Sequence, residues 1–518
     1  MSEAAMDPDV PGGRAEAARQ IRGSSLLLAG RVLSLLLNLV VQVVTVRVLS
    51  KEGYGVFAYA ISIAAITEGI IGLGLPRAIA RFLPIFDEND DRPRMLGTIT
   101  LGVAATLATG AAAMLVIAGL RGSIAGQLAK DPTALAALVI LSALAPLQGL
   151  DRLFLELFSV FGRPQAIFVR RFLLGPIFRL AAVLMIAARG GGPVALAWGY
   201  VIAGLVGLVF YGHMLAILLR ERGLLRPGAW ATMKIPAPEI FAFAIPLLST
   251  ELVFLGIQQA DAVMLGQMAG PAQIASLKAV VPFARLNQVV LDIFGILFTP
   301  YAARLFARGD HVGVNRLYWS TTTWVAVLSF PIFAVTFMMG RHLAPILLGK
   351  TYADSGILLE ILSFAYYIHA ALGPNGLTLN VYKYIRYVVL INVIAFGLHI
   401  TGNLLLIPRL GAEGAAIATA STLILHNAMK QFGLRKTGVR WLDPAGLKPL
   451  GVVAMGVAAL VAVEKTMQPS LPVSAAVAAV VILLVFLGTR RALDIETAFP
   501  QLMRIPGMSR ILGVSGRT

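Results

Sequence analysis

The sequence predicts an all-α polytopic membrane protein, and two observations support this fold class. Of the 518 residues, 58% are hydrophobic and only 13% are charged, and the mean hydropathy is +0.81. The apolar residues also gather in runs of about 20 or more, the length that a helix needs to cross the hydrocarbon core of a bilayer. No stretch of the chain is polar enough to form a separate soluble domain.

Apolar windows between charged, glycine and proline breaks give about fourteen membrane spans. The first window follows a polar segment that has no small-residue cleavage site, so we expect an uncleaved helix rather than a signal peptide. The expected spans are residues 25–46, 56–75, 95–119, 134–158, 166–188, 194–219, 240–266, 274–299, 317–339, 354–373, 384–407, 411–429, 446–464 and 472–489.

Basic residues between the spans predict the orientation of the chain. With the N-terminus inside, roughly two-thirds of the 43 Lys and Arg residues fall on the inner side. Arg92 and Arg94 form one such cluster, and Arg304 and Arg308 belong to another. We therefore expect both termini in the cytoplasm. These loops also account for the net charge of +17, so we expect no nucleic-acid partner.

Several kinds of activity are disfavoured. The outer loops are only a few turns long, which leaves no room for the extracytoplasmic domain of a membrane glycosyltransferase, ligase or polymerase, so we do not expect an enzyme. The chain contains no cysteine, which removes disulfides, thiol catalysis and cysteine metal sites. Its six histidines are dispersed without metal-ligand spacing, and we expect neither a metal nor a cofactor.

The first span carries a polar stripe. Arg31, Ser34, Asn38, Gln42 and Thr45 follow one another at intervals of three or four residues, so they share one face of a helix. A charged stripe in a membrane span should face water, another helix or a substrate, because an unpaired charge in lipid is costly.

The eighth span carries charges at heptad intervals. Lys278, Arg285 and Asp292 lie seven residues apart, almost two full turns, so an unbroken helix would present all three on one face. We expect Lys278 and Arg285 to supply positive potential to a hydrated cleft. The simpler alternative is that Arg285 pairs with Asp292 or Asp261 and only holds helices together.

The seventh span carries two further acids and an amide, Glu251, Asp261 and Gln258. Gln258 joins Asn38 and Gln42 as a candidate for binding hydroxyl groups in the cleft. The acids within spans are candidates for coupling to a proton or another cation. They are Glu68, Glu251, Asp261, Asp292 and Glu360. A further group, Asp151, Arg152 and Glu156, is expected to be an interfacial salt-bridge cluster.

Two stretches about 220 residues apart are similar and suggest an internal repeat. One reads GLGLPRAIARF and the other GILFTPYAARLF. Six spans separate them, so both copies would enter the membrane in the same direction. We expect a first lobe at residues 1–234, a second at 235–440, and the last two spans with a cytoplasmic tail at 441–518.

Three stretches together resemble a known family. They are RVLSKEGYGVFAYAIS with GLGLPRAIARF after it, ADAVMLG in the seventh span, and NLLLIPRLGAEGAAIAT before the twelfth. They are similar to the Wzx-like polysaccharide transporters of the multidrug/oligosaccharidyl-lipid/polysaccharide exporter superfamily. In related flippases an arginine of the first span and a basic residue of the eighth lie at positions that Arg31 and Arg285 match.

The resemblance implies two six-helix bundles in a V, with the last two helices outside, alternating between inward-open and outward-open states. It implies a bacterial inner-membrane flippase for undecaprenyl-diphosphate-linked oligosaccharides. Polymerase and chain-length proteins of O-antigen, capsule or exopolysaccharide synthesis would be its partners, and H⁺ or Na⁺ its coupling ion. Arg31, Lys278 and Arg285 would then bind the diphosphate. A lipid II flippase and a cation-coupled multidrug exporter remain as alternatives.

Overall fold

The computed structural model describes residues 13–119, 132–440 and 443–493, and these residues are helical without any strand. The chain divides into two compact units, residues 1–275 and 276–518, each of which is considered by itself. Within the described residues, twelve helices are long and apolar enough to span a membrane, or thirteen if a bent pair counts as one span.

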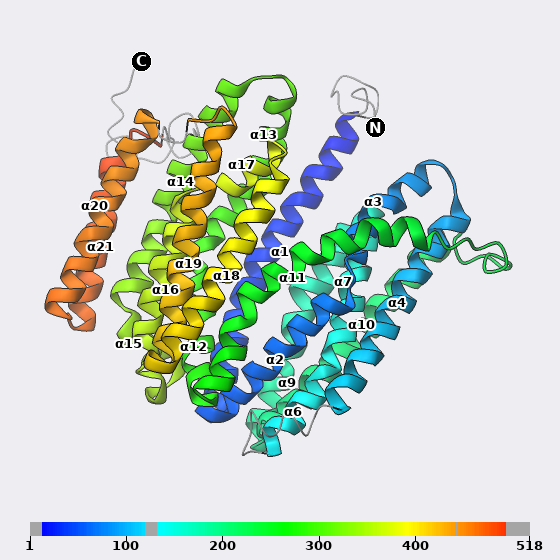
Figure 1. Cartoon of the computed structure of the whole chain (residues 1–518), viewed down its shortest axis with the longest axis horizontal. Coiled ribbons are helices and arrows are strands. Elements are labelled where there is room, and N and C mark those ends of the chain that lie inside the picture. The colour runs from blue at the N-terminus through cyan, green and yellow to red at the C-terminus, as the bar shows by residue number, and fades with distance from the viewer. Residues whose placement is uncertain (1–12, 120–131, 441–442, 494–518) are drawn as a thin grey trace. The chain divides into compact units, whose positions relative to one another are not determined.

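The first unit consists of helices and the segments that connect them, of which residues 222–236 form a long loop (Figure 1). They are α1 (Gly13–Val48), α2 (Lys51–Ile71), α3 (Leu75–Glu88), α4 (Arg92–Gly119), α6 (Pro132–Ser142), α7 (Leu144–Val160), α8 (Pro164–Ile167), the π-helix η2 (Phe168–Leu174), α9 (Gly175–Arg189), α10 (Pro193–Glu221) and α11 (Ala237–Met268).

The core of the first unit lies among α3, α4, α7 and α10. Phe158 of α7 stacks on Tyr211 of α10, with ring centroids 4.7 Å apart. Helix α3 is amphipathic, because Ile79 and Leu83 are buried while Arg81 is exposed and lies over the ring of Phe243 at 4.4 Å. This core holds α7 rigidly, and α7 carries the charged residues of the candidate site.

The second unit continues from α12 (Pro271–Ala284), whose first residues still belong to the first unit. Its other helices are the 3₁₀ helix η3 (Arg285–Gln288), α13 (Val289–Ala307), α14 (His311–Met338), α15 (Gly340–Leu348), the 3₁₀ helix η4 (Lys350–Tyr352), α16 (Ser355–Ala371), α17 (Asn375–Val381), α18 (Ile385–Leu410), α19 (Ala412–Gly433), the 3₁₀ helix η5 (Leu434–Lys436), α20 (Pro444–Met467) and α21 (Leu471–Thr489).

Helix α14 is the centre of the second unit and packs against α13, α16, α20 and α21. Phe333 of α14 stacks on Tyr367 of α16, with centroids 4.5 Å apart. Helices α20 and α21 form an antiparallel pair, here called the C-terminal hairpin, which is coloured orange and red in Figure 1. Val453 and Val485 bury the hairpin against α14.

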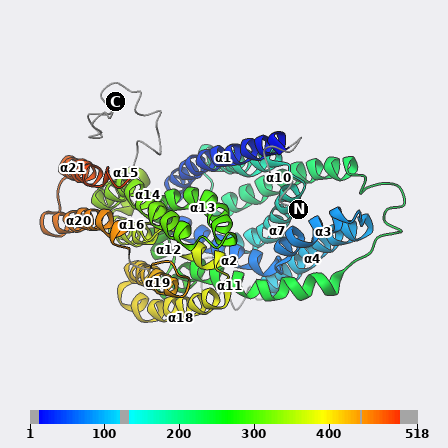
Figure 2. The ribbon, with the colours of Figure 1, turned by 90° about the horizontal axis from the view of Figure 1, so that it is seen from above.

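The prediction of about fourteen spans agrees closely with the structure, and α19 accounts for the difference. Thirteen of the expected spans coincide with the twelve helices and the bent pair. The span expected at 411–429 is not apolar enough to count among the membrane-spanning helices. This stretch is nevertheless a helix, α19, which lies along α18 and packs on α16 (Figure 2). Neighbouring helices cover Ala415, Ala416 and Asn427, so α19 does not need a lipid-facing apolar surface.

Candidate functional site

Three charged residues from three helices of the first unit converge in what is here called the acid–arginine triad. Arg152 of α7 places Nη1 2.6 Å from Oε1 of Glu251 on α11. The same nitrogen lies 3.8 Å from Oε1 of Glu68 on α2. Both acids belong to the candidates for ion coupling, so the structure brings two predicted residues together around an arginine that the sequence assigns to an interface.

The triad combines buried acids with an accessible arginine. The side chains of Glu68 and Glu251 are 21% and 12% exposed, whereas that of Arg152 is 46% exposed. Two carboxylates with one guanidinium carry a net negative charge when both acids are ionised. Because charge is costly within a membrane span, the arrangement favours a second positive charge, such as a proton or cation, whenever Arg152 is engaged elsewhere.

Close packing of α2 against α11 brings the two acids within reach of Arg152. Gly69 and Gly266 allow this approach, and Gly55 allows the start of α12 to approach α2 in the same way. A Cβ atom at Gly55 would overlap the carbonyl oxygen of Pro271, one at Gly69 would overlap Leu255, and one at Gly266 would overlap the ring of Tyr59. Such small-residue contacts let helix backbones approach in a membrane.

A bend in α11 also positions Glu251. The segments Ala237–Pro246 and Glu251–Met268 are inclined at 41°, and proline is a common cause of such a kink, because it cannot donate the backbone hydrogen bond of its turn. Glu251 therefore begins the second half of a broken helix. Broken helices in membrane proteins are a frequent place for binding sites.

A second ion pair lies beside the triad on the same turn of α7. Oδ1 of Asp151 lies 2.8 Å from Nη2 of Arg170 as an ion pair, and the Arg170 side chain is 10% exposed. Arg170 belongs to the π-helix η2, and its guanidinium fits against Gly207 of α10, where a Cβ would come within 2.7 Å of Cζ. π-Helical turns are frequent at functional sites.

We expected Asp151, Arg152 and Glu156 to form one interfacial cluster, but Asp151 and Arg152 have different partners on other helices. Asp151 pairs with Arg170, whereas Arg152 pairs with Glu251 and Glu68. The sequence indicated only that Glu68 and Glu251 are intramembrane acids without a cation nearby in sequence. Which arginine pairs with them depends on how α2, α7 and α11 pack, and residue spacing in the sequence does not predict that packing.

The polar stripe of α1 is partly used within the first unit. Asn38 donates to the backbone oxygen of Ser34 at 2.7 Å and to its hydroxyl at 3.0 Å, as the helical spacing predicts. Gln42 donates to the hydroxyl of Tyr54 on α2 at 2.8 Å. Arg31 is exposed on the same helix. Gln258 is half-buried and Asp261 is buried, and both lie on α11 one to three turns beyond Glu251.

In the second unit the eighth span is interrupted where its charges lie. Lys278 is on α12, Arg285 opens the 3₁₀ helix η3, and Asp292 is in the first turn of α13. A 3₁₀ turn has three residues instead of 3.6, so it rotates Asp292 away from the position that an unbroken helix would give it relative to Arg285. Arg285 donates to the hydroxyl of Tyr366 on α16 at 3.2 Å, with its guanidinium 5.8 Å from that ring.

The last acid among the candidates, Glu360, has its partner within the second unit. It is buried on α16 and pairs with Arg341 of α15, whose Nε is 3.1 Å from Oε1 of Glu360. Among the described residues no three His, Cys, Asp or Glu side chains are grouped as a metal site.

Two family models match the sequence. A model described as polysaccharide biosynthesis protein covers residues 21–306, more than half of the chain. A second, described as MatE, covers residues 246–405. Among curated proteins none matches this sequence significantly.

The fold is shared with several solved transporters. The inward closed conformation of the lipid II flippase MurJ is similar over 93% of this chain and all of its own, with a TM-score of 0.67 and 12% identity. An inward-facing multidrug resistance MATE transporter of the MOP superfamily covers 78% of this chain and 94% of its own, with a TM-score of 0.63 and 13% identity. A MOP superfamily transporter from Pyrococcus furiosus covers 85% and 98%, with a TM-score of 0.54 and 15% identity.

Proposed function

Because the chain belongs to the polysaccharide biosynthesis protein family and has the fold of MOP superfamily transporters, we propose that it is a flippase for lipid-linked oligosaccharides. Its cargo would be an undecaprenyl-diphosphate oligosaccharide, moved from the inner to the outer leaflet of a bacterial inner membrane for surface polysaccharide synthesis. Polymerase and chain-length proteins would take up the product outside.

The chemistry of this cargo fits the residues that line the spans. A diphosphate is an anion that needs cationic partners in a medium where charge is costly, and arginine suits phosphate because its guanidinium can donate two parallel hydrogen bonds. We assign the diphosphate to Arg31, Lys278 and Arg285. Sugar hydroxyls would be met by amides, for which we assign Asn38, Gln42 and Gln258.

The observation that carries the proposal most strongly is the acid–arginine triad. Arg152 is held by two buried acids yet keeps 46% of its side chain exposed, so an incoming anion can compete for it. When the diphosphate held by those three cations also draws Arg152 away, Glu68 and Glu251 lose their counter-charge, and the uptake of a proton or cation restores it. Anion binding and cation binding would in this way favour each other, which links the cargo to the ion thermodynamically.

The remaining coupling candidates support the same mechanism less directly. Asp261 is buried two to three turns beyond Glu251 on α11, Asp292 follows the 3₁₀ break, and Glu360 is paired with Arg341. We propose that the lobes at residues 1–234 and 235–440 alternate access to the cargo, while residues 441–518 add the C-terminal hairpin and a cytoplasmic tail.

A lipid II flippase is the second candidate. It would carry the same undecaprenyl diphosphate, so the charged residues suit both cargoes equally, and the MurJ fold extends over 93% of this chain. A multidrug exporter is the third. We rank it lower because exporters of cationic drugs favour acids in their cavities, whereas the eighth span has Lys278 before its break and Arg285 at the break.

Depletion of the protein in its native cells separates these candidates. We expect an undecaprenyl-diphosphate oligosaccharide to accumulate on the inner leaflet of viable cells that lose their surface polysaccharide. Accumulation of lipid II with lysis would instead identify the peptidoglycan precursor as the cargo. Unchanged lipid-linked sugars with increased drug sensitivity would contradict the flippase proposal.

A further inference from the structure

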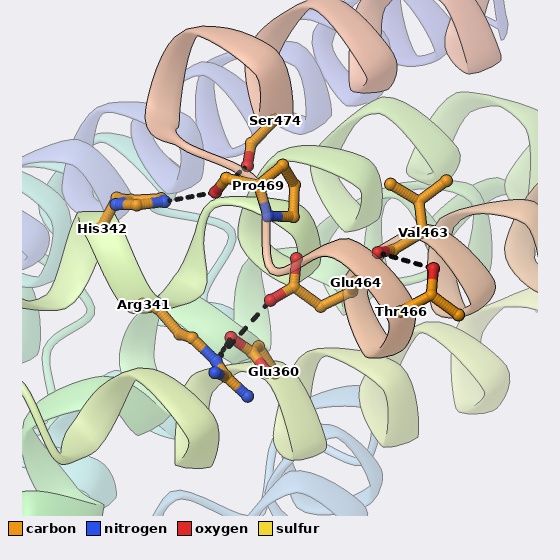
Figure 3. A network of polar contacts seen from close by, with 8 residues as sticks. All are labelled: Arg341, His342, Glu360, Val463, Glu464, Thr466, Pro469 and Ser474. Atoms are coloured by element: carbon orange, nitrogen blue, oxygen red, sulfur yellow. Dashed lines mark hydrogen bonds and ion pairs between the residues drawn. The ribbon is translucent and has the colours of Figure 1, made fainter.

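A second cluster of buried charges joins the C-terminal hairpin to the rest of the second unit. Arg341 of α15 lies between Glu360 of α16 and Glu464 in the last turn of α20 (Figure 3). Its Nε atom is 3.1 Å from Oε1 of Glu360 and 3.6 Å from Oε1 of Glu464. These three residues are here called the C-terminal charge cluster.

The cluster has more buried negative charge than positive charge. The side chains of Glu360 and Glu464 are 8% and 7% exposed, whereas that of Arg341 is 40% exposed. The second carboxylate oxygen of Glu464, Oε2, is fully buried and accepts no hydrogen bond from the described residues. A buried carboxylate oxygen without a donor is costly in its ionised form, and much less costly when it carries a proton.

The surroundings bring little further charge to the pair. His342 of α15 hydrogen-bonds the backbone oxygen of Pro469 in the hairpin turn at 3.0 Å, which leaves Arg341 as the cation in contact with both acids (Figure 3). Lys465 follows Glu464 on α20 but is exposed. Neither α21 nor the adjoining end of α14 contains a titratable side chain.

We propose that Glu360 and Glu464 form a proton-binding site that holds one exchangeable proton and controls how firmly the C-terminal hairpin is attached. A proton suits the site better than a metal ion, because the guanidinium of Arg341 already occupies the place between the two acids and only one negative charge is left to neutralise. The inference deepens the ion coupling proposed for Glu360, but it requires no cargo.

The proton acts on the hairpin through the charge balance. With one proton bound, one carboxylate and Arg341 form a neutral pair, and the protonated acid needs no counter-charge. When that proton leaves, a second buried negative charge appears beside the first. Like charges in a poorly hydrated place repel, so the end of α20 separates from α15 and α16 while the apolar contacts of α14 hold the rest.

Because the native chain has no cysteine, spin labels can be attached at chosen positions and the distance between them measured. Ile346→Cys and Met467→Cys replace residues that are 52% and 70% exposed, and they place one spin label on α15 and one at the end of α20. In nanodiscs without cargo, we expect a narrow distribution of label distances at acidic pH and a broad one at alkaline pH. Glu464→Gln, which imitates the protonated acid, should keep the narrow distribution at every pH.

Infrared spectroscopy detects the proton itself and needs no spin label. The band is recorded on the native chain, and single-residue variants assign it. We expect a carbonyl band of a protonated carboxyl group that disappears on alkalinisation, and that is missing from Glu360→Gln or Glu464→Gln but retained in Glu413→Gln, whose acid is exposed on α19. Label distances that do not change with pH, or a band that both cluster variants retain, would overturn the proposal. Since no transport is measured, that result would leave the flippase proposal standing.

Discussion

At the scale of single residues, Arg152 and Arg163 illustrate how surroundings decide what an ion pair contributes. Each places a guanidinium nitrogen 2.6 Å from a glutamate oxygen, Arg152 with Glu251 and Arg163 with Glu221. Glu221 is 54% exposed, so water can replace its partner, whereas Glu251 is only 12% exposed. At the same distance, Arg163 and Glu221 therefore form a weak surface ion pair, whereas Glu251 depends on Arg152 to neutralise a charge that water reaches poorly.

We expect Arg152→Gln to destabilise the protein and abolish transport. The substitution leaves two buried acids without their shared cation, which should lower the free energy of unfolding by about 1–3 kcal/mol. Melting temperature in detergent and flipping in vesicles provide the measurements. The matched control is Arg163→Gln, for which we expect a loss of about 1 kcal/mol or less and normal transport. Equal effects of the two variants would contradict the role of the triad.

Arg285→Ala should abolish transport while leaving membrane insertion normal. The side chain contacts the hydroxyl and ring of Tyr366, and its removal takes a cation from the eighth span. Tyr366→Phe is the comparison, because it keeps the ring and removes the hydroxyl, and we expect it to reduce transport only slightly. Transport at the native rate by Arg285→Ala would refute our assignment of this residue to the diphosphate.

How much of the site the sequence could predict follows from these residues. The acids Glu68 and Glu251 could be singled out because charge within a membrane span is rare. Their partner could not, because Arg152 reaches them only through the packing of three helices that are distant in sequence. Likewise, the spacing of Lys278, Arg285 and Asp292 assumed a continuous α-helix, and no residue signalled that Arg285 begins a 3₁₀ turn.

At the scale of helices, the approach of α11 and the start of α12 to α2 depends on glycines. We expect Gly55→Ala to reduce stability by about 1–3 kcal/mol, because the added methyl group would meet backbone atoms of Pro271 that cannot move aside. Gly397→Ala on α18 is the control, since its Cβ would meet nothing within 4 Å. Thermal unfolding of both variants measures the difference. Equal melting temperatures would show that α2 and the start of α12 are not in close contact here.

The fold could be predicted further than the site, and α19 shows where its prediction is least secure. Span length and hydrophobicity locate lipid-facing helices well, because lipid imposes one requirement on all of them. Helix α19 is covered by α16 and α18, so small and polar residues such as Asn427 replace the apolar ones. Its span was predicted from an apolar window at 411–429, and the alternation of charged loops agreed with the count that includes it.

At the scale of the whole molecule, the orientation of the chain tests whether α19 crosses the membrane. Val312 at the start of α14 and Met467 at the end of α20 are 71% and 70% exposed. Five expected spans separate them, so they should lie on opposite sides. We expect a membrane-impermeant maleimide to label a single cysteine at Met467 in intact cells, and one at Val312 only after permeabilisation. Labelling of both cysteines only after permeabilisation would mean that α19 does not span.

We propose that this protein moves a lipid-linked oligosaccharide between leaflets, and transport by the purified protein in vesicles measures that movement. Purified protein would be placed in vesicles that contain undecaprenyl-diphosphate oligosaccharide, and an impermeant sugar oxidant would report the fraction exposed outside. We predict that the native protein makes nearly all of the oligosaccharide accessible, whereas Arg152→Gln leaves only the outer-leaflet fraction accessible. If vesicles with the native protein behave like empty vesicles while lipid II is moved instead, the proposed cargo is wrong.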